Sequence, residues 1–365
     1  MTNQTFSILA LDGGGIRGLV TAIMLDRLEK KLKQYDSNKP LKDYFDLIAG
    51  TSTGSLIACG IGYGLNASQI KELYIDRGEV IFKQSERFIF RISRLFNPIS
   101  YSRPMFDGTG LEEVLQQELG KMELFQNLEK PTLVTSYDTY NRTPVIFNNT
   151  QTSCSTIKTW QVCRASSSAP IAFPGYLLTD PIFLDEEEKK GKKIPIDSEG
   201  KKYLPLIDGG VVANNPALFA IAHCLREKPE IQEENIITAS FGTGQKISSI
   251  NGEQVREWGL LEWISPLKGI PLVDTIFDGS ADAVNEISKQ ILSRCQFFRF
   301  QPIFEEDFSA FDADPKQLKA MQKATEIAME SQGIEEELDR LVEIMTSTNP
   351  ASETSNTSNT ETASV

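Results

Sequence analysis

Ser52 stands at the centre of the stretch whose residue types could perform chemistry. The stretch, residues 50–54, reads GTSTG, so a glycine lies two positions before and two positions after the serine. An apolar run precedes it, and small and aliphatic residues follow. This order predicts a buried strand, a sharp turn and a helix. Such a turn exposes the serine at the positive end of a helix, where an oxyanion is stabilised. The same letters also suit a flexible loop, so the surrounding residues must decide.

A serine nucleophile needs a group that accepts its proton, and histidine is the familiar one. The chain has a single histidine, His223, which lies inside a predicted helix over residues 217–226. A histidine in the middle of a helix is more typical of packing than of catalysis. We therefore look for the base among the carboxylates.

Asp208 is the carboxylate with a suitable setting. It follows a predicted strand over residues 203–207 and precedes Gly209 and Gly210, which leave room beside it. In a parallel sheet, that strand would bring Asp208 to the same carboxyl edge as Ser52. The unperturbed pKa of an aspartate, about 3.9, makes it a weak base, but burial raises that pKa. A turn residue before two glycines is an equally good interpretation of Asp208.

A glycine-rich loop near the start of the chain is the third candidate element. Residues 12–18 read DGGGIRG between a predicted strand, 6–11, and a predicted helix, 19–33. Gly13, Gly15 and Gly18 satisfy a dinucleotide-binding pattern, but the second strand does not end in the acidic residue that would bind a ribose. The loop suits an oxyanion hole instead, because Gly14 and Gly15 leave backbone N–H groups unshielded. Arg17 would either add positive charge there or clamp a carboxylate.

Repeated strand-loop-helix units predict an α/β fold in which helices cover both faces of a mainly parallel central sheet. Further strands are predicted over 131–136, 143–148, 236–241 and 296–301, with the last at an edge, and further helices over 67–77, 111–119 and 315–345. We expect one domain over residues 1–345, with its core in 6–300 and a helical extension in 301–345. Residues 346–365 are rich in Ser, Thr, Asn and Glu, which predicts a disordered tail. Residues 180–203 form a charged excursion, predicted to be a hairpin or loop.

Charge and cysteine content limit the function classes. The net charge of −13 disfavours nucleic-acid binding, which needs a basic face. The five cysteines are scattered and odd in number, which suits a reducing compartment. We find no signal-like start and no apolar run long enough to span a bilayer, and we expect a cytoplasmic protein. Residues 79–106 interleave aromatic and basic side chains, which suits either peripheral membrane contact or an ordinary surface helix.

Five segments together resemble the patatin-like phospholipase family in order and spacing. They are DGGGIRG at 12–18, GTSTG at 50–54, RASSSAPIAFP at 164–174, DGGVVANNP at 208–216 and SFGTG at 240–244. The resemblance covers roughly residues 6 to 300. The commoner form of the fourth motif is DGA rather than DGG, which is a small change.

The resemblance implies a three-layer α/β/α fold and a lipid acyl hydrolase that cleaves fatty-acyl esters of phospholipids or related lipids. It implies a serine-aspartate dyad of Ser52 and Asp208, an oxyanion hole in the loop Gly13 to Gly15, and no metal or cofactor in the dyad chemistry. The glycines and the arginine that support these elements are Arg17, Gly18, Gly50, Gly54, Gly209 and Gly210. A dinucleotide-dependent oxidoreductase and a non-catalytic lipid-binding module are the alternatives.

Overall fold

The two strand-loop-helix units predicted near the start of the chain form the centre of the fold. Strand β1 (Phe6–Leu11) leads through the glycine loop into helix α1 (Gly18–Leu32). Strand β2 (Leu47–Thr51) leads through Ser52 into helix α2 (Thr53–Tyr63). The computed structural model describes residues 5–82, 104–246, 249–263, 271–293 and 296–347.

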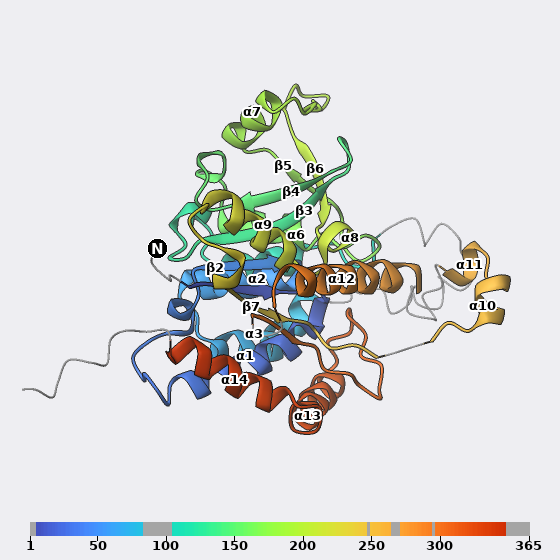
Figure 1. Ribbon diagram of the computed structural model, residues 1–365. Coiled ribbons are helices and arrows are strands. Elements are labelled where there is room, and N and C mark those ends of the chain that lie inside the picture. Colours follow the sequence, from blue (N-terminus) through green and yellow to red (C-terminus); the bar gives the residue numbers. More distant parts are fainter. Residues whose placement is uncertain (1–4, 83–103, 247–248, 264–270, 294–295, 348–365) are drawn as a thin grey trace, which may run out of the picture.

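The strands that the structure describes join one sheet in the order β5-β6-β3-β2-β1-β7-β8, with β4 paired to β3 outside this path. In Figure 1 the sheet extends from β5 and β6 in the upper part to β7 near the middle. Strands β3, β2, β1, β7 and β8 run parallel, and β8 forms the predicted edge. The remaining strands are β3 (Thr132–Asp138), β4 (Thr143–Asn148), β5 (Tyr176–Leu178), β6 (Leu204–Asp208), β7 (Ile236–Phe241) and β8 (Phe297–Phe300). The mainly parallel sheet that the sequence predicts is therefore present.

The direction of β6 differs from the expectation. Strand β6 runs antiparallel to β3 and pairs only with the last residues of β3, so that Asp208 lies opposite Ser136. The adjacent β3 residue, Thr135, lies opposite Thr51 of β2. Asp208 therefore reaches the level of Ser52 from the opposite direction, because β6 ends where the β2–β3 pairing ends. The meeting of the two residues does not depend on parallel strands.

Helices cover both faces of the sheet, as side-chain alternation along β1 requires. Leu9 and Leu11 belong to the larger core cluster, which includes residues of α1 and α2. Ile8 and Ala10 face the smaller cluster, which includes residues of α9 and α12. The other main helices are α3 (Ala67–Ile81), α5 (Thr109–Glu118), α6 (Thr159–Ser166), α7 (Pro181–Lys189), α8 (Gly210–Ala213), α9 (Ala217–Glu227), α10 (Gly252–Glu257), α11 (Leu260–Trp263) and α12 (Pro271–Ile291).

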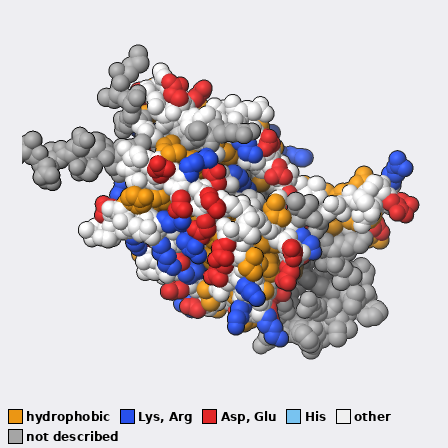
Figure 2. All heavy atoms as spheres, turned by 60° about the horizontal axis from the view of Figure 1, so that its bottom comes forward, with side chains coloured by type: hydrophobic (Ala, Val, Ile, Leu, Met, Phe, Trp, Pro, Cys, Tyr) orange, Lys and Arg blue, Asp and Glu red, His pale blue; other side chains and the backbone are white. Residues whose placement is uncertain are grey.

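The predicted helical extension packs on the core. It consists of α13 (Pro315–Ser331) and α14 (Ile334–Ser347), and both contact α1. Arg27 and Lys31 of α1 pair with Glu335 of α14. Figure 2 shows the face that carries these two helices, where acidic and basic side chains are interspersed.

Three further predictions concern particular segments. The excursion at 180–203 begins with a helix, α7, because Asp180 caps its N-terminus and accepts a hydrogen bond from the Phe183 N–H, whereas the sequence predicted a hairpin or loop. Most of the basic-aromatic segment 79–106 and the tail from residue 348 lie outside the described residues, so membrane contact and a disordered tail stay predictions. None of the helices that the structure describes combines the length and apolar character needed to cross a bilayer.

Candidate active site

Ser52 occupies the strained turn that the sequence predicts. Its backbone has φ 53° and ψ −123°, a left-handed conformation that non-glycine residues avoid. The flanking glycines permit the turn because they let neighbouring backbone segments approach closely. A Cβ on Gly50 would lie 2.3 Å from the Gly54 carbonyl oxygen, and one on Gly54 would lie 2.1 Å from that of Leu11. Helix α2 begins at the next residue, so the positive end of its dipole faces Ser52.

Asp208 is fully buried at the end of β6. Its Oδ1 accepts a 2.7 Å hydrogen bond from the Gly210 N–H, while Oδ2 is buried without a hydrogen-bond partner among the described residues. Burial raises the pKa of Asp208 to about 7, although a polar contact with the Ser52 side chain and the Gly210 N–H each lower it. The Ser52 side chain therefore lies close enough to Asp208 to lower the pKa of that carboxyl group, although Oδ2 accepts no hydrogen bond from it.

The last turn of α6 and the residues after it hold Ser52 and Asp208 together. Ser166 Oγ accepts a 2.8 Å hydrogen bond from the Ser52 N–H, and the Ser168 carbonyl accepts one of 3.0 Å from the Asp208 N–H. The Arg164 guanidinium, itself buried, donates to Ser168 Oγ and to the Pro174 carbonyl. The RASSSAP motif therefore positions both candidate residues by accepting hydrogen bonds from their backbone N–H groups.

The glycine loop lies directly against Ser52. A Cβ on Gly13 would lie 3.1 Å from the Ser52 Cβ. The Gly13 N–H already donates to the Asn214 carbonyl at 3.1 Å. No acceptor among the described residues meets the N–H of Gly14 or Gly15. The structure therefore leaves Gly14 and Gly15, rather than Gly13, as the available donors of this loop.

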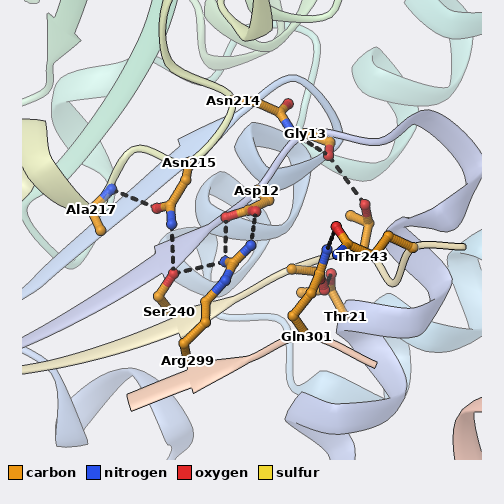
Figure 3. A network of polar contacts seen from close by, with 12 residues as sticks. Asp12, Gly13, Thr21, Asn214, Asn215, Ala217, Ser240, Thr243, Arg299 and Gln301 are labelled. Atoms are coloured by element: carbon orange, nitrogen blue, oxygen red, sulfur yellow. Dashed lines mark hydrogen bonds and ion pairs between the residues drawn. The ribbon is translucent and has the colours of Figure 1, made fainter. Parts of the chain in front are cut away.

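Polar contacts from three other segments fix the loop (Figure 3). The Gly13 carbonyl accepts hydrogen bonds from Asn214 Nδ2 at 3.4 Å and from Thr243 Oγ1 at 3.2 Å. The buried Asp12 carboxylate receives two hydrogen bonds from the Arg299 guanidinium, at 3.0 and 2.6 Å. Arg299 also donates to Ser240 Oγ at 2.9 Å. Burial raises the pKa of Asp12, and the positive charge of Arg299 opposes that rise.

An apolar hollow opens beside Ser52 and the loop. Ser52, Gly15 and Ser167 contribute to its wall, and so do three phenylalanines, Phe82, Phe173 and Phe311. The hollow measures about 360 Å³, its open mouth included. Apolar walls with few polar groups at one end are typical of a site for a ligand that has an apolar tail and a polar reacting group.

Comparison with known proteins identifies the family. A family model described as patatin-like phospholipase matches residues 9–221, more than half of the chain. The chain belongs to the patatin-like phospholipase family. It is 31% identical to patatin-like protein 2 of Arabidopsis thaliana over 322 residues, which are 81% of this chain and 75% of that protein.

Two further matches add context to the family assignment. The chain is 30% identical to the probable inactive patatin-3-Kuras 1 of Solanum tuberosum, over 72% of this chain and 70% of that protein. The crystal structure of VipD from Legionella pneumophila matches with a TM-score of 0.41 and 13% identity, over 92% of this chain and 67% of that one. At this TM-score the likeness supports no conclusion about fold or activity.

The other predicted site residues of this patatin-like chain have distinct surroundings. Arg17 is partly buried, and its Nε has no hydrogen-bond partner among the described residues. Burial raises the pKa of Asp274 to about 6 and also raises that of Asp278, and the nearby charge of Arg17 opposes both rises. Arg17 forms no ion pair within the part of the chain that the structure describes. His223 contacts Asn148 at 3.5 Å, and Asn148 pairs with Leu133 near the start of β3, away from Asp208.

Sequence reasoning missed the residues that hold the candidate site residues in place. Arg299 lies in none of the five motifs, and Ser166 lies in one of them without an assigned role, yet Arg299 contacts Asp12 and Ser166 contacts Ser52. The apolar letters around Arg299 could have marked it as a buried cation that needs a carboxylate partner. No group of three His, Cys, Asp or Glu side chains in the described residues is arranged to hold a metal ion.

Proposed function

We propose that this protein is a lipid acyl hydrolase that cleaves fatty-acyl esters of phospholipids or related lipids through an acyl-enzyme on Ser52. Its family supports lipid hydrolysis. In this proposal, Ser52 is the nucleophile, Asp208 is the proton acceptor and the N–H groups of Gly14 and Gly15 bind the oxyanion. The protein's own side chains and amides then supply the whole dyad chemistry.

The reaction begins when Ser52 Oγ attacks the ester carbonyl carbon and its proton passes to Asp208 Oδ2. The carbonyl oxygen becomes an oxyanion, which the loop N–H groups stabilise. When the tetrahedral intermediate collapses, the bond to the alcohol breaks and the alcohol takes the proton from Asp208. Water then attacks the acyl-enzyme and gives a proton to Asp208. The fatty acid leaves as Ser52 recovers that proton.

The observation that carries the proposal is the state of Asp208. Its Oδ2 is buried without a partner beside Ser52, and its pKa of about 7 is that of a useful base near neutral pH. A purely structural aspartate at a turn would use both oxygens in hydrogen bonds, because an unpaired buried acceptor costs about 1–3 kcal/mol. The strained φ of Ser52 supports the same conclusion.

A fluorophosphonate probe tests the nucleophile, and a chromogenic acyl ester tests the base. We expect the probe to modify the peptide that contains Ser52 and to leave Ser52→Ala unlabelled. Asp208→Asn should lower ester hydrolysis by roughly 10³-fold or more, since members of a catalytic pair fail together. His223→Ala serves as the control and should retain activity. An inactive His223→Ala beside an active Asp208→Asn, with both variants folded, would refute the assignment.

The same variants separate this proposal from lipid binding without catalysis. A binding module would bind phospholipid vesicles equally well with Ser52 or with Ala at this position, and neither form would release fatty acid. Fatty-acid release that depends on Ser52 would establish an enzyme.

A further inference from the structure

Asn214 brings an unused hydrogen-bond acceptor into the candidate site. The residue is 7% exposed, and its Oδ1 is buried without a hydrogen-bond partner among the described residues. Its amide nitrogen is engaged, because Nδ2 donates to the Gly13 carbonyl at 3.4 Å (Figure 3). That contact decides which amide atom is the oxygen, since a flipped amide would place two acceptors together. An unpaired buried acceptor costs about 1–3 kcal/mol, which a purely structural asparagine has no need to bear.

Backbone contacts hold Asn214 beside the nucleophile. Its carbonyl accepts a 3.1 Å hydrogen bond from the Gly13 N–H. The preceding carbonyl, that of Ala213, accepts a 2.7 Å hydrogen bond from Thr51 Oγ1, and Thr51 directly precedes Ser52. The position of the Asn214 side chain relative to Ser52 is therefore fixed, as the orientation of a reacting molecule requires.

Two glycines show how close Asn214 Oδ1 lies to both members of the dyad. A Cβ built on Gly13 would lie 2.4 Å from Asn214 Oδ1 and 3.1 Å from the Ser52 Cβ. A Cβ built on Gly210 would lie 3.1 Å from Asn214 Oδ1 and 3.1 Å from Asp208 Oδ1. Asn214 Oδ1 and the Asp208 carboxylate therefore border the same small region beside Ser52.

Two buried acceptors without donors suit a molecule that has two donor hydrogens. Oδ2 of Asp208, like Oδ1 of Asn214, lacks a hydrogen-bond partner among the described residues. A water molecule can donate one hydrogen to each acceptor, and two to four polar partners are enough to hold it in a buried site. Since each such O–H···O bond is about 2.7–2.8 Å long, one water can bridge acceptors that lie about 5 Å apart. The second half of the proposed reaction needs such a water, which must give a proton to Asp208.

We propose that Asn214 Oδ1 and Asp208 Oδ2 together bind the water that hydrolyses the acyl-enzyme on Ser52. This inference rests on the proposed acyl hydrolase function and adds Asn214 as a catalytic residue of deacylation. Once the alcohol has left, one O–H bond of the water breaks and its proton passes to Asp208, while the water oxygen bonds to the acyl carbon. Asn214 accepts a hydrogen bond from the other hydrogen and so orients the oxygen. Collapse then breaks the bond between the acyl carbon and Ser52 Oγ, which recovers the proton from Asp208, and the fatty acid leaves.

Separate rates of acylation and deacylation test this inference. The measurement is stopped-flow release of p-nitrophenolate from p-nitrophenyl butanoate, in which the burst reports acylation and the steady state reports deacylation. This ester carries no N–H or O–H group, so an effect of Asn214 on its turnover cannot come from a hydrogen bond that the substrate donates. In Asn214→Ala, deacylation should slow roughly 10- to 100-fold more than acylation, because the water loses its orientation. A burst of about one p-nitrophenolate per protein should therefore appear, and kcat should fall more than kcat/KM.

Thr243→Val is the matched control. Thr243 Oγ1 donates to the same Gly13 carbonyl at 3.2 Å, and valine has the shape of threonine. Both half-reactions form an oxyanion at the glycine loop, so this variant should slow acylation and deacylation by a similar factor. If the two rates of Asn214→Ala also fall by a similar factor, Asn214 only positions the loop, and the inference is overturned.

A crystal structure of the unmodified protein decides the question if Asn214→Ala does not fold. We expect an ordered water within hydrogen-bond distance of both Asn214 Oδ1 and Asp208 Oδ2. Clear density for these side chains without such a water would overturn the inference and leave the proposed function standing. If the unmodified protein hydrolyses no ester and Ser52 takes no fluorophosphonate, the proposed function fails and the inference fails with it.

Discussion

At the scale of single residues, Asp208 combines two properties that oppose each other. Burial without a partner for Oδ2 raises the pKa of the carboxyl group toward the value that the proposed base needs, and it also makes the charged form unfavourable in the folded protein. Ser52 shows a similar conflict, since its left-handed backbone costs about 1–3 kcal/mol that the surrounding contacts must offset. Residues that break a local rule in this way mark functional sites.

The raised pKa of Asp208 predicts opposite effects of pH on stability and activity. Because the folded-state pKa of about 7 exceeds the unfolded value of 3.8, the folded protein binds more protons. This contribution to stability is therefore complete below pH 3.8 and is lost as the pH rises toward 7. Asp208→Asn should be more stable than the unmodified protein at pH 8, by up to about 4 kcal/mol in the free energy of unfolding, and this difference should shrink to about 1–2 kcal/mol at pH 5.

Activity of the unmodified protein should rise through the same pH range, because Asp208 accepts a proton only when it is ionised. Urea unfolding curves and kcat/KM profiles on a soluble ester measure the two effects. A stability difference between Asp208→Asn and the unmodified protein that stays constant between pH 5 and pH 8 would contradict the role of burial at Asp208.

At the scale of secondary-structure elements, the sequence predicts what is local and misses what depends on pairing. The strands around Leu9 and Ile48 and the turn at Ser52 follow from apolar runs and glycine spacing, and the structure contains them. The antiparallel direction of β6 is set by tertiary packing, and the apolar run before Asp208 does not indicate it. The contact of Ser166 with the Ser52 N–H joins residues 114 positions apart, so no local pattern reports it.

Strand β8 supplies the cation that neutralises the start of the glycine loop. Asp12 is 2% exposed, and the Arg299 guanidinium is its charged partner. We therefore assign Arg299 and Asp12 as positioning residues. Arg299→Met should lower the free energy of unfolding by about 3–5 kcal/mol, because it leaves a buried charge unpaired. It should also lower kcat more than it changes KM, since the proposed mechanism has the loop N–H groups bind the oxyanion.

Two further variants separate positioning from a general loss of stability. Arg299→Lys keeps the charge but loses the two-pronged contact, so it should recover stability and only part of kcat. Asp12→Asn combined with Arg299→Met should be more stable than Arg299→Met alone, because no buried charge remains. Urea unfolding and kcat on a soluble ester measure both. Full recovery of kcat in Arg299→Lys would argue against a role of this pair in loop geometry.

At the scale of the whole molecule, the C-terminal helices complete the core that carries the site. The family model ends at residue 221, yet β7 pairs with β1, β8 extends the sheet from β7, and α13 and α14 contact α1. Met321 and Met329 of α13 and Leu341 of α14 belong to the same buried cluster as Leu19 and Leu25 of α1. The Arg340 guanidinium lies 4.7 Å from the centre of the Phe298 ring, which joins α14 to β8. One domain through residue 345 stays a prediction.

Leu338 tests whether the C-terminal helices and the sheet that carries the candidate site unfold as one unit. Its side chain is fully buried, so Leu338→Ala should lower the free energy of unfolding by about 2–5 kcal/mol through lost contacts and a residual cavity. Glu336→Ala, at an exposed position of α14, is the matched control and should change the free energy by at most about 0.5 kcal/mol. In a single cooperative unit, loss of helical circular dichroism and loss of ester hydrolysis must share one urea midpoint, and Leu338→Ala must shift both equally. If α14 instead melts first while hydrolysis persists, the extension is a separate layer, and the ion pairs of Arg27 and Lys31 with Glu335 contribute little to the active site.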